Sequence, residues 1–372
     1  MGSSVTIAPG AGGERRIVVG RRLKCNPRLL PSRPSVERDA PHGNGAATCG
    51  PTRRGLGGRA HVSVLAVVRL TLVGGFLASA LYVHYRGRVR LSVRRQLTDH
   101  STFLAPYNVL VYLFSRVPRT PLLPVEEFPE MTPLRANWRT IRDEAMRLYD
   151  AGHIRASDQY DDLGFNSFFR KGWKRFYLKW YGAPLPSARA LCPQTVALVE
   201  AIPTVHGAMF ALIGPRSKVG EHRDPFAGSI RYHLGLITPN RDECRIFVDG
   251  NKYSWRDGED LVFDETYVHR FENLTDETRI ILFCDVERPL RTRVMRALNR
   301  FVIRHVVAMT ATKNVEGETV GLANRIFSYV YLTRAPVKRF KKANRRLYYA
   351  VKYALIASAL WIAVFGGYRV LH

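Results

Sequence analysis

The chain has 372 residues, of which 46% are hydrophobic, and 57 Lys+Arg against 31 Asp+Glu give a formal net charge of +26. It is too apolar to be wholly disordered and long enough for one sizeable core with appendages. The excess charge lies in residues 1–60, 86–95 and 288–346, whereas residues 96–287 are slightly acidic, so we expect no nucleic-acid partner. The five cysteines form no CxxC pair, which argues against a disulfide framework or a zinc site.

Residues 1–60 are rich in Gly, Pro, Ala and Arg without periodicity and predict a disordered basic tail. No methionine lies between Met1 and Met131, so an alternative is that this tail is a mis-annotated start. A cleavable signal peptide is not indicated, because the first apolar run comes too late in the chain.

Residues 61–85 predict a transmembrane helix. The stretch from Leu70 to Tyr85 is uncharged, and with the residues before it, and Arg69 snorkelling, it is long enough to span a hydrocarbon core of roughly 30 Å. Five arginines follow in residues 86–95, and the positive-inside rule places this side in the cytoplasm. The alternative interpretation is a buried core helix.

Residues 86–154 are expected to form a juxtamembrane and helical lead-in. Within it, apolar residues recur every three or four positions from Thr132 to Ile154, with Pro133 in the first turn, which predicts a helix.

Residues 170–181 mix five basic residues with five aromatic ones. In a functional interpretation, the basic groups meet the phosphates of an anionic glycolipid and the aromatic rings lie near its acyl chains. In a structural interpretation, the stretch is a strand with one buried aromatic face and one solvated basic face. The sequence leaves both open.

From residue 207 onward, short runs of β-type residues alternate with loops rich in Gly, Pro, Asn and Asp. The runs are AMFALIG, IRYHLGLI, CRIFVDG, YSW, DLVFD and RIILFCDV. Many short strands at regular spacing predict a mainly β fold, an antiparallel sandwich or barrel.

Three residues of this β region suggest a metal site. His222 and Asp224 form an H-x-D in a predicted loop, and His269 opens a later strand. Two imidazoles and one carboxylate on one face of a metal leave three open positions, which is typical of non-haem Fe(II) oxygenases. The alternative is that His222 and Asp224 cap a surface turn and His269 lies at a half-buried strand end.

Arg279 opens the strand that follows, ten residues after His269. A guanidinium inside a β barrel is costly without a partner, and a bidentate carboxylate would resolve that cost. The alternative is that Arg279 pairs with Asp276 or Glu277.

Residues 291–347 predict a basic amphipathic region on an anionic membrane surface. Four arginines are interspersed with its apolar face, which comprises Val294, Met295, Leu298, Phe301, Val302 and Val306. The alternative is a helix that packs on the domain and solvates its basic side. Residues 348–368 predict a second transmembrane helix, and the basic run before it again points to the cytoplasm. The alternative is again a buried core helix.

Several ordered motifs resemble the aspartyl/asparaginyl β-hydroxylase family, in particular its membrane-bound members that hydroxylate lipid A in Gram-negative bacteria. The similarity runs from about residue 74 to 289, and the motifs are GFNSFFRKGWKRFYLKWYG, GEHRDPFAGSIRYHLGL, DGEDLVFDETYVHRFEN and TRIILFCDVERP. The resemblance implies that residues 155–290 form a dioxygenase domain with a double-stranded β-helix (jelly roll) that uses Fe(II), 2-oxoglutarate and O2.

The resemblance also implies roles for individual residues. His222 and His269 match the iron ligands of the family, and Arg279 matches the arginine that holds the distal carboxylate of 2-oxoglutarate. Further cosubstrate contacts match Arg231, His233 and Trp173. A serine that contacts the cosubstrate in animal members is replaced by Ala211. Those members also lack an acidic residue at the position of Asp224, so its ligation is an inference from residue type.

These observations predict an Fe(II)/2-oxoglutarate-dependent hydroxylase that modifies carbon 2 of a lipid A acyl chain. We expect its catalytic domain on the cytoplasmic side of a bacterial inner membrane, with lipid A or a related anionic glycolipid as partner. Two alternatives are a membrane-anchored aspartyl/asparaginyl hydroxylase of proteins and a non-catalytic β-fold binding module at the membrane.

Overall fold

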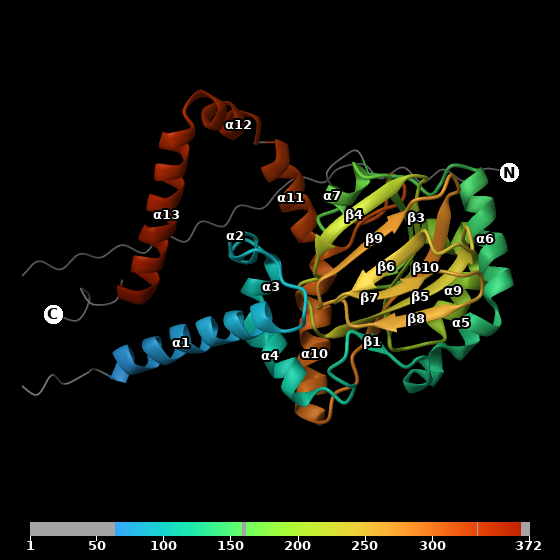
Figure 1. Ribbon diagram of the computed structural model, residues 1–372, viewed down its shortest axis with the longest axis horizontal. Coiled ribbons are helices and arrows are strands. Elements are labelled where there is room, and N and C mark those ends of the chain that lie inside the picture. The colour runs from blue at the N-terminus through green and yellow to red at the C-terminus, as the bar shows by residue number, and fades with distance from the viewer. Residues whose placement is uncertain (1–63, 158–160, 333, 366–372) are drawn as a thin grey trace, which may run out of the picture. The chain divides into compact units, whose positions relative to one another are not determined.

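The computed structural model describes residues 64–157, 161–332 and 334–365 (Figure 1). The predicted basic tail, residues 1–60, lies outside these residues. The first three residues of the first predicted span and residues 366–368 of the second do so as well.

Helix α1 (Val64–Tyr85) is the first predicted span. Among the described residues, one helical stretch, Ala66–Tyr85, is long and apolar enough to cross a bilayer, with a mean hydropathy of 1.8. Only 6% of its most apolar window is buried, so the alternative of a buried core helix is wrong for α1 within this chain. Helix α13 (Arg345–Phe365) covers most of the second predicted span but does not meet the same criterion, and that span stays a prediction.

The next five α-helices in the chain are α2 (Val93–Gln96), α3 (His100–Phe103), α4 (Ala105–Phe114), α5 (Thr132–Ala136) and α6 (Trp138–Asp150). The helix predicted from residue 132 to 154 is therefore two helices that break at Asn137, whose side-chain amide donates to the carbonyl of Pro133 at 2.8 Å. It also ends earlier than predicted, because Gly152 adopts a φ of +71° and turns the chain away.

The predicted mainly β fold is confirmed as two antiparallel sheets. The six-stranded sheet has the order β1-β8-β5-β10-β3-β2, and the four-stranded sheet has the order β4-β9-β6-β7. The strands are β1 (Leu122–Leu123), β2 (Trp173–Trp180), β3 (Val205–Ile213), β4 (Ser217–His222), β5 (Ser229–Ile237), β6 (Cys244–Val248), β7 (Asn251–Ser254), β8 (Asp260–Phe263), β9 (His269–Asn273) and β10 (Arg279–Glu287).

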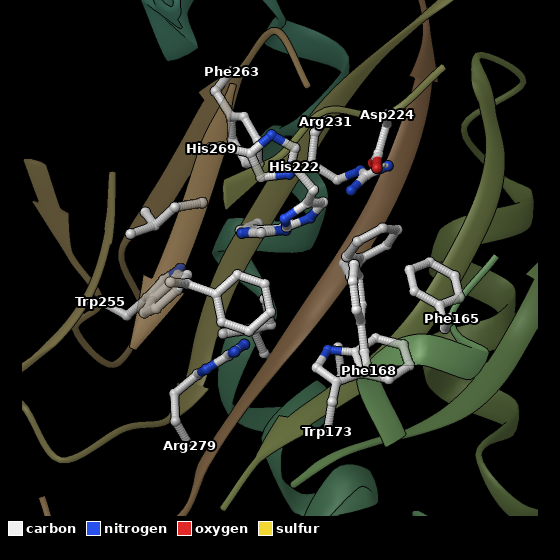
Figure 2. Close-up of a pocket in the computed structure, with 16 residues that line it drawn as sticks. Phe165, Phe168, Trp173, His222, Asp224, Arg231, Trp255, Phe263, His269 and Arg279 are labelled. Atoms are coloured by element: carbon white, nitrogen blue, oxygen red, sulfur yellow. Dashed lines mark hydrogen bonds and ion pairs between the residues drawn. The ribbon is translucent and has the colours of Figure 1, made fainter. Parts of the chain in front are cut away.

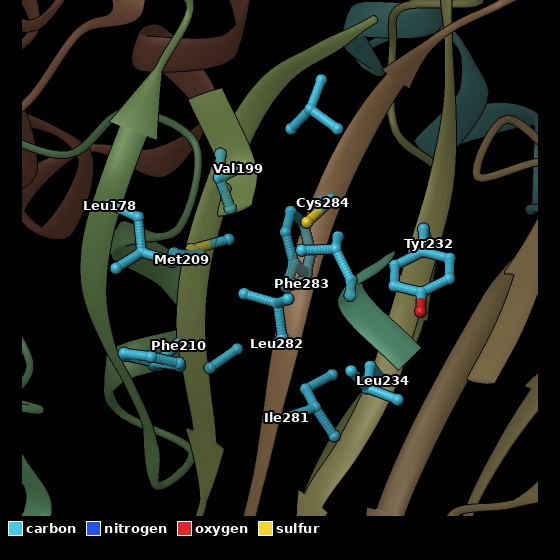
Figure 3. Close-up of a cluster of buried hydrophobic side chains, with 14 of the residues drawn as sticks. Leu178, Val199, Met209, Phe210, Tyr232, Leu234, Ile281, Leu282, Phe283 and Cys284 are labelled. Atoms are coloured by element: carbon cyan, nitrogen blue, oxygen red, sulfur yellow. The ribbon is translucent and has the colours of Figure 1, made fainter. Parts of the chain in front are cut away.

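Strand β10 shows how the larger sheet separates core from site. Every residue from Arg279 to Glu287 is buried, and successive side chains point to opposite faces. Leu282 and Cys284 face a hydrophobic cluster with Phe210 of β3 and Val199 of α9 (Pro193–Glu200), as Figure 3 shows. Helices α6 and α9 cover this outer face. The alternate residues of β10 therefore point to the opposite face, where the pocket described below lies.

The remaining helices are α7 (Asn166–Phe169), α8 (Pro186–Leu191), α10 (Arg293–His305), α11 (Leu322–Leu332) and α12 (Arg334–Ala343), and the 3₁₀ turns are η1 (Val125–Glu127), η2 (Pro129–Met131) and η3 (Val307–Thr310). Helix α10 buries Met295, Asn299 and Ile303 at four-residue spacing and exposes Val294 and Phe301. It therefore packs on the domain, and the predicted apolar face is divided between the domain and solvent.

Candidate functional site

Two histidines and one aspartate meet where β4 and β9 pair. His222 is the last residue of β4 rather than a loop residue as predicted, and it lies opposite His269, the first residue of β9, in the antiparallel register. Asp224 follows two residues later. One ligand atom from each of the three residues lies within 4.8 Å of the others, which is close enough for all three to bind one metal ion. His269 is buried, whereas His222 and Asp224 are partly exposed.

Backbone carbonyls orient both imidazoles. Nδ1 of His222 donates to the carbonyl of Gly220 at 2.8 Å, and Nδ1 of His269 donates to the carbonyl of Tyr267 at 3.0 Å. Since a carbonyl oxygen only accepts, Nε2 of each ring keeps its lone pair for a ligand. Burial, reinforced by the charge of His269, lowers the pKa of His222 to about 3, and burial also lowers the pKa of His269. Both rings are thus neutral near pH 7.

Arg231 holds Asp224. Its Nη2 donates to Asp224 Oδ2 at 2.8 Å and its Nε to Asp285 Oδ1 at 2.7 Å. Burial alone would raise the pKa of Asp224. The nearby Arg231 and the two histidines have a larger combined effect, so the pKa of this carboxyl is lowered. Tyr181 donates to the other oxygen of Asp285 at 2.9 Å. Arg231 therefore lies in the site as predicted, but two of its nitrogens are bound to protein carboxylates.

Arg279 is a buried cation without an ionic partner among the described residues. Its Nε and Nη1 have no hydrogen-bond partner, and it is 1% exposed. Its guanidinium lies 4.3 Å from the centre of the Trp255 ring, and burial lowers its pKa to about 10. Asp276 pairs with Arg216 instead, and Glu277 makes no ion pair with Arg279, so the alternative pairing of Arg279 is wrong. A buried guanidinium in this state is complementary to an anion.

These groups line one pocket between the two sheets, of about 400 Å³ including its open mouth. Figure 2 shows His222, His269 and Asp224 together on one side of the pocket and Arg279 on the opposite side. The lining residues are Phe165, Phe168, Trp173, Ala211, His222, Asp224, Arg231, His233, Ile246, Trp255, Phe263, His269, Phe271, Arg279, Ile281 and Phe283. All seven residues predicted for the site are among them, and so is Ala211. Both ring nitrogens of His233 lack a partner, and burial lowers its pKa.

The sequence did not indicate the aromatic side chains that close the pocket. The ring of Phe168 packs edge-on against His222 with centroids 4.7 Å apart, and Phe165 stacks on Trp173 at 4.5 Å. Trp255 and Phe263 were missed as well. Their signal is weak, because isolated aromatic residues in a β domain fit an ordinary core equally well.

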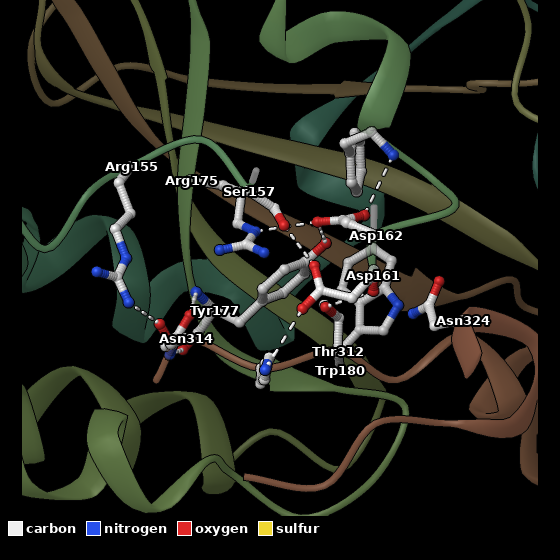
Figure 4. A network of polar contacts seen from close by, with 12 residues as sticks. Arg155, Ser157, Asp161, Asp162, Arg175, Tyr177, Trp180, Thr312, Asn314 and Asn324 are labelled. Carbon is white, nitrogen blue, oxygen red and sulfur yellow. Dashed lines mark hydrogen bonds and ion pairs between the residues drawn. The ribbon is translucent and has the colours of Figure 1, made fainter. Parts of the chain in front are cut away.

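A buried polar network supports Phe165 (Figure 4). Asp162 accepts from Arg175 Nε and from the Tyr177 hydroxyl, each at 3.0 Å, and from the backbone N–H of Phe165 at 3.2 Å. Asn324 of α11 also accepts from the N–H of Leu163 at 2.7 Å. Because Arg175 is buried in this ion pair, the predicted solvated basic face of residues 170–181 is wrong at that position.

The residues present fit a divalent metal ion and an anionic cosubstrate. Two neutral imidazoles and an ionised carboxylate form the donor set that leaves open positions on Fe(II). The unpaired nitrogens of Arg279 supply the opposite charge for a carboxylate across the pocket. This arrangement is able to hold a dianion between a metal and a guanidinium.

Comparison with known proteins gives a consistent result. Residues 135–289 match the family model described as aspartyl/asparaginyl β-hydroxylase. The chain is 40% identical over 121 residues to the ornithine lipid ester-linked acyl 2-hydroxylase of Rhizobium tropici, covering 32% of this chain and 43% of that protein. It is 27% identical over 168 residues to the human aspartyl/asparaginyl β-hydroxylase, covering 44% of this chain and 22% of that protein. The chain therefore spans less than half the length of either relative.

Among solved structures, a prolyl-4-hydroxylase from Pseudomonas putida aligns with 41% of this chain and 86% of its own, at 16% identity and a TM-score of 0.30. A likeness this slight carries no argument about the pocket or its chemistry.

Proposed function

Residues 135–289 make the chain a member of the aspartyl/asparaginyl β-hydroxylase family, and on that premise we propose an Fe(II)- and 2-oxoglutarate-dependent dioxygenase that hydroxylates carbon 2 of an ester-linked acyl chain in a membrane lipid. One observation carries the proposal: an unpaired, fully buried Arg279 faces a histidine–aspartate–histidine triad across one pocket. The two facing antiparallel sheets support the double-stranded β-helix that this chemistry implies.

In this proposal His222, His269 and Asp224 hold Fe(II), and Arg279 binds the distal carboxylate of 2-oxoglutarate. When bound, the metal and cosubstrate supply the activation of O2, with succinate and CO2 as co-products. Arg231 holds Asp224 in place through its bond to Asp285, so the carboxylate is oriented before the metal arrives.

The rest of the pocket protects and orients these groups. Phe165, Phe168 and Trp173 surround the pocket near His222 and exclude water from it. His233 offers two unpaired ring nitrogens to the bound cosubstrate, and the ring of Trp255 supports the guanidinium of Arg279. Ala211 contributes no hydrogen bond at its position.

A membrane lipid as substrate is supported by the exposed surface of the chain. Apolar side chains of α1 such as Leu70, Leu72 and Leu77 are 56–68% exposed, which suits the interior of a bilayer. The exposed basic residues that follow α1, such as Arg88 and Arg90, together with the basic residues of the region 291–347, suit an anionic cytoplasmic membrane surface. We therefore keep an inner-membrane location, with the domain in the cytoplasm, as part of the proposal.

The chemistry of the lipid fits the position of the site. Carbon 2 adjoins the ester carbonyl, so it lies at the boundary between the hydrocarbon core and the headgroups. Arg223, which lies between two residues of the triad, donates to the carbonyl of Val83 in the last turn of α1. The end of a membrane-spanning α1 would thus hold the pocket next to that boundary. The ornithine lipid hydroxylase among the relatives favours an ester-linked acyl chain, and lipid A remains a second lipid of this kind.

The test uses the full chain in bilayer nanodiscs with Fe(II) and 2-oxoglutarate, offered ornithine lipid, lipid A or a peptide that contains Asp and Asn. We expect one of the lipids to gain one oxygen atom, with an equal amount of succinate, and we expect no gain with His222→Ala. Fragmentation of the released fatty acid then places the hydroxyl at carbon 2.

Two other results would overturn the proposal. Oxidation of the peptide but not of either lipid would establish a protein hydroxylase. Fe(II) binding without succinate under every condition would establish a binding module.

A further inference from the structure

The end of α1 and the segment that follows it, residues 83–89, contact both loops next to the triad: the loop that follows His222 and carries Asp224, and the loop that precedes His269. We call residues 83–89 the exit segment. Its first residue, Val83, is 2% exposed and belongs to a small hydrophobic cluster with Tyr112, Ala227 and Leu290. The positive-inside rule places the basic residues of this segment on the cytoplasmic side, but the Arg86 side chain is buried inside the protein.

The first contact is made by the residue between His222 and Asp224. Arg223 is 5% exposed, and its Nη1 donates to the carbonyl of Val83. The carbonyls of the last helical turn lack partners within the helix and carry partial negative charge, which attracts the guanidinium. This attraction offsets only part of the burial cost, because Nε and Nη2 of Arg223 have no hydrogen-bond partner among the described residues. The loop of the first two triad residues is thus bonded directly to the end of α1.

The second contact reaches the loop before His269. The guanidinium of Arg86 donates to Asp264 Oδ2 and to Thr266 Oγ1, each at 2.7 Å. It lies between the rings of Tyr112 and Tyr267, 4.0 and 3.8 Å from their centres. The Arg86 side chain is only 7% exposed, so this charge belongs to the domain rather than to a membrane surface.

Tyr267 carries this contact to the metal site. Its ring packs on Arg86, and its carbonyl accepts the hydrogen bond from Nδ1 of His269. Bonds to the outer nitrogen of a ligating histidine fix the ring orientation and commonly alter metal affinity by about 10- to 100-fold when they are lost. Arg86 therefore acts on His269 through a single residue.

The third contact fixes the backbone of the exit segment. Oδ1 of Asp249 accepts from the N–H groups of Arg88 and Val89 at 2.6 and 2.7 Å, and the N–H of Asp249 donates to the carbonyl of Val268 at 2.8 Å. Gly87 has a φ of +89°, and a Cβ there would lie 2.8 Å from Asp249 Oδ1. Only glycine fits this turn without displacing the carboxylate.

We propose that the exit segment is a positioning element that holds the His222–Asp224 loop and the loop before His269 in the geometry that binds the metal. The inference rests on the proposed metal site and adds residues to it that touch neither metal nor substrate. It also means that the placement of α1 in a bilayer is coupled to the geometry of the triad, because the exit segment is continuous with α1 and is bonded to both loops next to the triad.

The test measures binding of Co(II), a redox-stable substitute for Fe(II), to the full chain in nanodiscs by calorimetry, and records the absorption spectrum of the bound Co(II), which reports its coordination geometry. We expect Arg86→Gln to weaken Co(II) binding by about tenfold or more and to change the spectrum. Arg86→Lys should restore little, because an ammonium does not reproduce the two-pronged contact.

Arg88→Gln is the matched control. This substitution removes the same charge two residues further along the chain. The Arg88 side chain is exposed, and the contact with Asp249 is made by its backbone N–H, which the substitution keeps. The Co(II) affinity and spectrum should therefore equal those of the unaltered chain. Gly87→Ala is the second test variant, because it retains every charge. If far-ultraviolet circular dichroism shows that Arg86→Gln is unfolded, Gly87→Ala becomes the variant that tests the inference.

Unchanged Co(II) affinity and spectrum in both Arg86→Gln and Gly87→Ala would overturn the inference and leave the proposed function intact. If the unaltered chain itself bound Co(II) no better than His222→Ala, the proposed metal site would fail, and the inference with it. An equal loss in Arg88→Gln would show a general effect of surface charge and would also overturn the inference.

Discussion

Replacing Arg279 with methionine is expected to raise the stability of the ligand-free protein while strongly weakening its binding of 2-oxoglutarate. The native guanidinium is fully buried, and its Nε and Nη1 have no partner among the described residues, so it carries a desolvation cost that the rings of Trp255 and Phe271 offset only in part. Removing an unsatisfied buried polar group recovers about 1–3 kcal/mol. Methionine occupies a similar volume without a charge, so the free energy of unfolding should increase.

Binding of the cosubstrate should change in the opposite direction. Loss of one partner of a buried, hydrogen-bonded charge pair costs about 2–5 kcal/mol, which corresponds to a loss of affinity of roughly 30-fold or more. Thermal unfolding of the metal-free chain and calorimetry with 2-oxoglutarate and Co(II) measure the two effects separately.

Arg216→Met provides the comparison. Arg216 lies at the surface and pairs with the exposed Asp276, so its replacement should change stability by less than about 0.5 kcal/mol and leave 2-oxoglutarate binding unaltered. A destabilised Arg279→Met protein would show that the arginine has an internal partner. Retained affinity for 2-oxoglutarate would show that the anion binds elsewhere.

Replacing either histidine of the triad should nearly eliminate metal binding. His222→Ala and His269→Ala each remove one of three donors, and the remaining pair forms a much weaker site. We expect Co(II) affinity to fall by roughly 100-fold or more, which exceeds the effect of losing an outer hydrogen bond. Calorimetry and the spectrum of bound Co(II) provide the measurement.

Asp224→Ala separates two roles for the carboxylate. If Asp224 ligates the metal, affinity should fall by a similar factor, and unchanged affinity and turnover would remove it from the ligand set. His100→Ala is the control, because His100 is exposed on α3 and should leave metal binding unchanged. A strong metal signal that survives His222→Ala and His269→Ala together would refute the site.

Much of the fold was predictable because strand signals are local. The alternation of β-type runs with turn residues located β3, β5, β6, β7, β8 and β10. Strand β4 was missed, because Ser217–His222 includes Lys218, Gly220 and Glu221 and exposes several of its side chains, so it lacks an apolar run. Similarly, periodicity does not reveal the break at Asn137, where the backbone leaves the helical region with φ −101° and ψ 19°.

The site was predictable in its residue types but not in its pairings. The H-x-D spacing and the second histidine identified three residues that the β4–β9 register brings together. The partners of the arginines depend on contacts across the fold: Arg231 bonds to Asp285 from another strand, and Arg86 to Asp264 from a loop 178 residues later. The sequence indicated for Arg86 only a cytoplasmic position next to the first predicted span, because the positive-inside rule uses the charge of an arginine and not its partner.

The most direct test of the central claim is the fate of isotopically labelled O2 in the reaction of the full chain with 2-oxoglutarate, Fe(II) and a bilayer that contains the acyl lipid. The account predicts one labelled atom in succinate and one in the new hydroxyl at carbon 2 of the acyl chain, with neither formed by His222→Ala. Labelled succinate with no oxygen gained by the lipid would contradict the proposed substrate, and an unlabelled hydroxyl would contradict the dioxygenase chemistry itself.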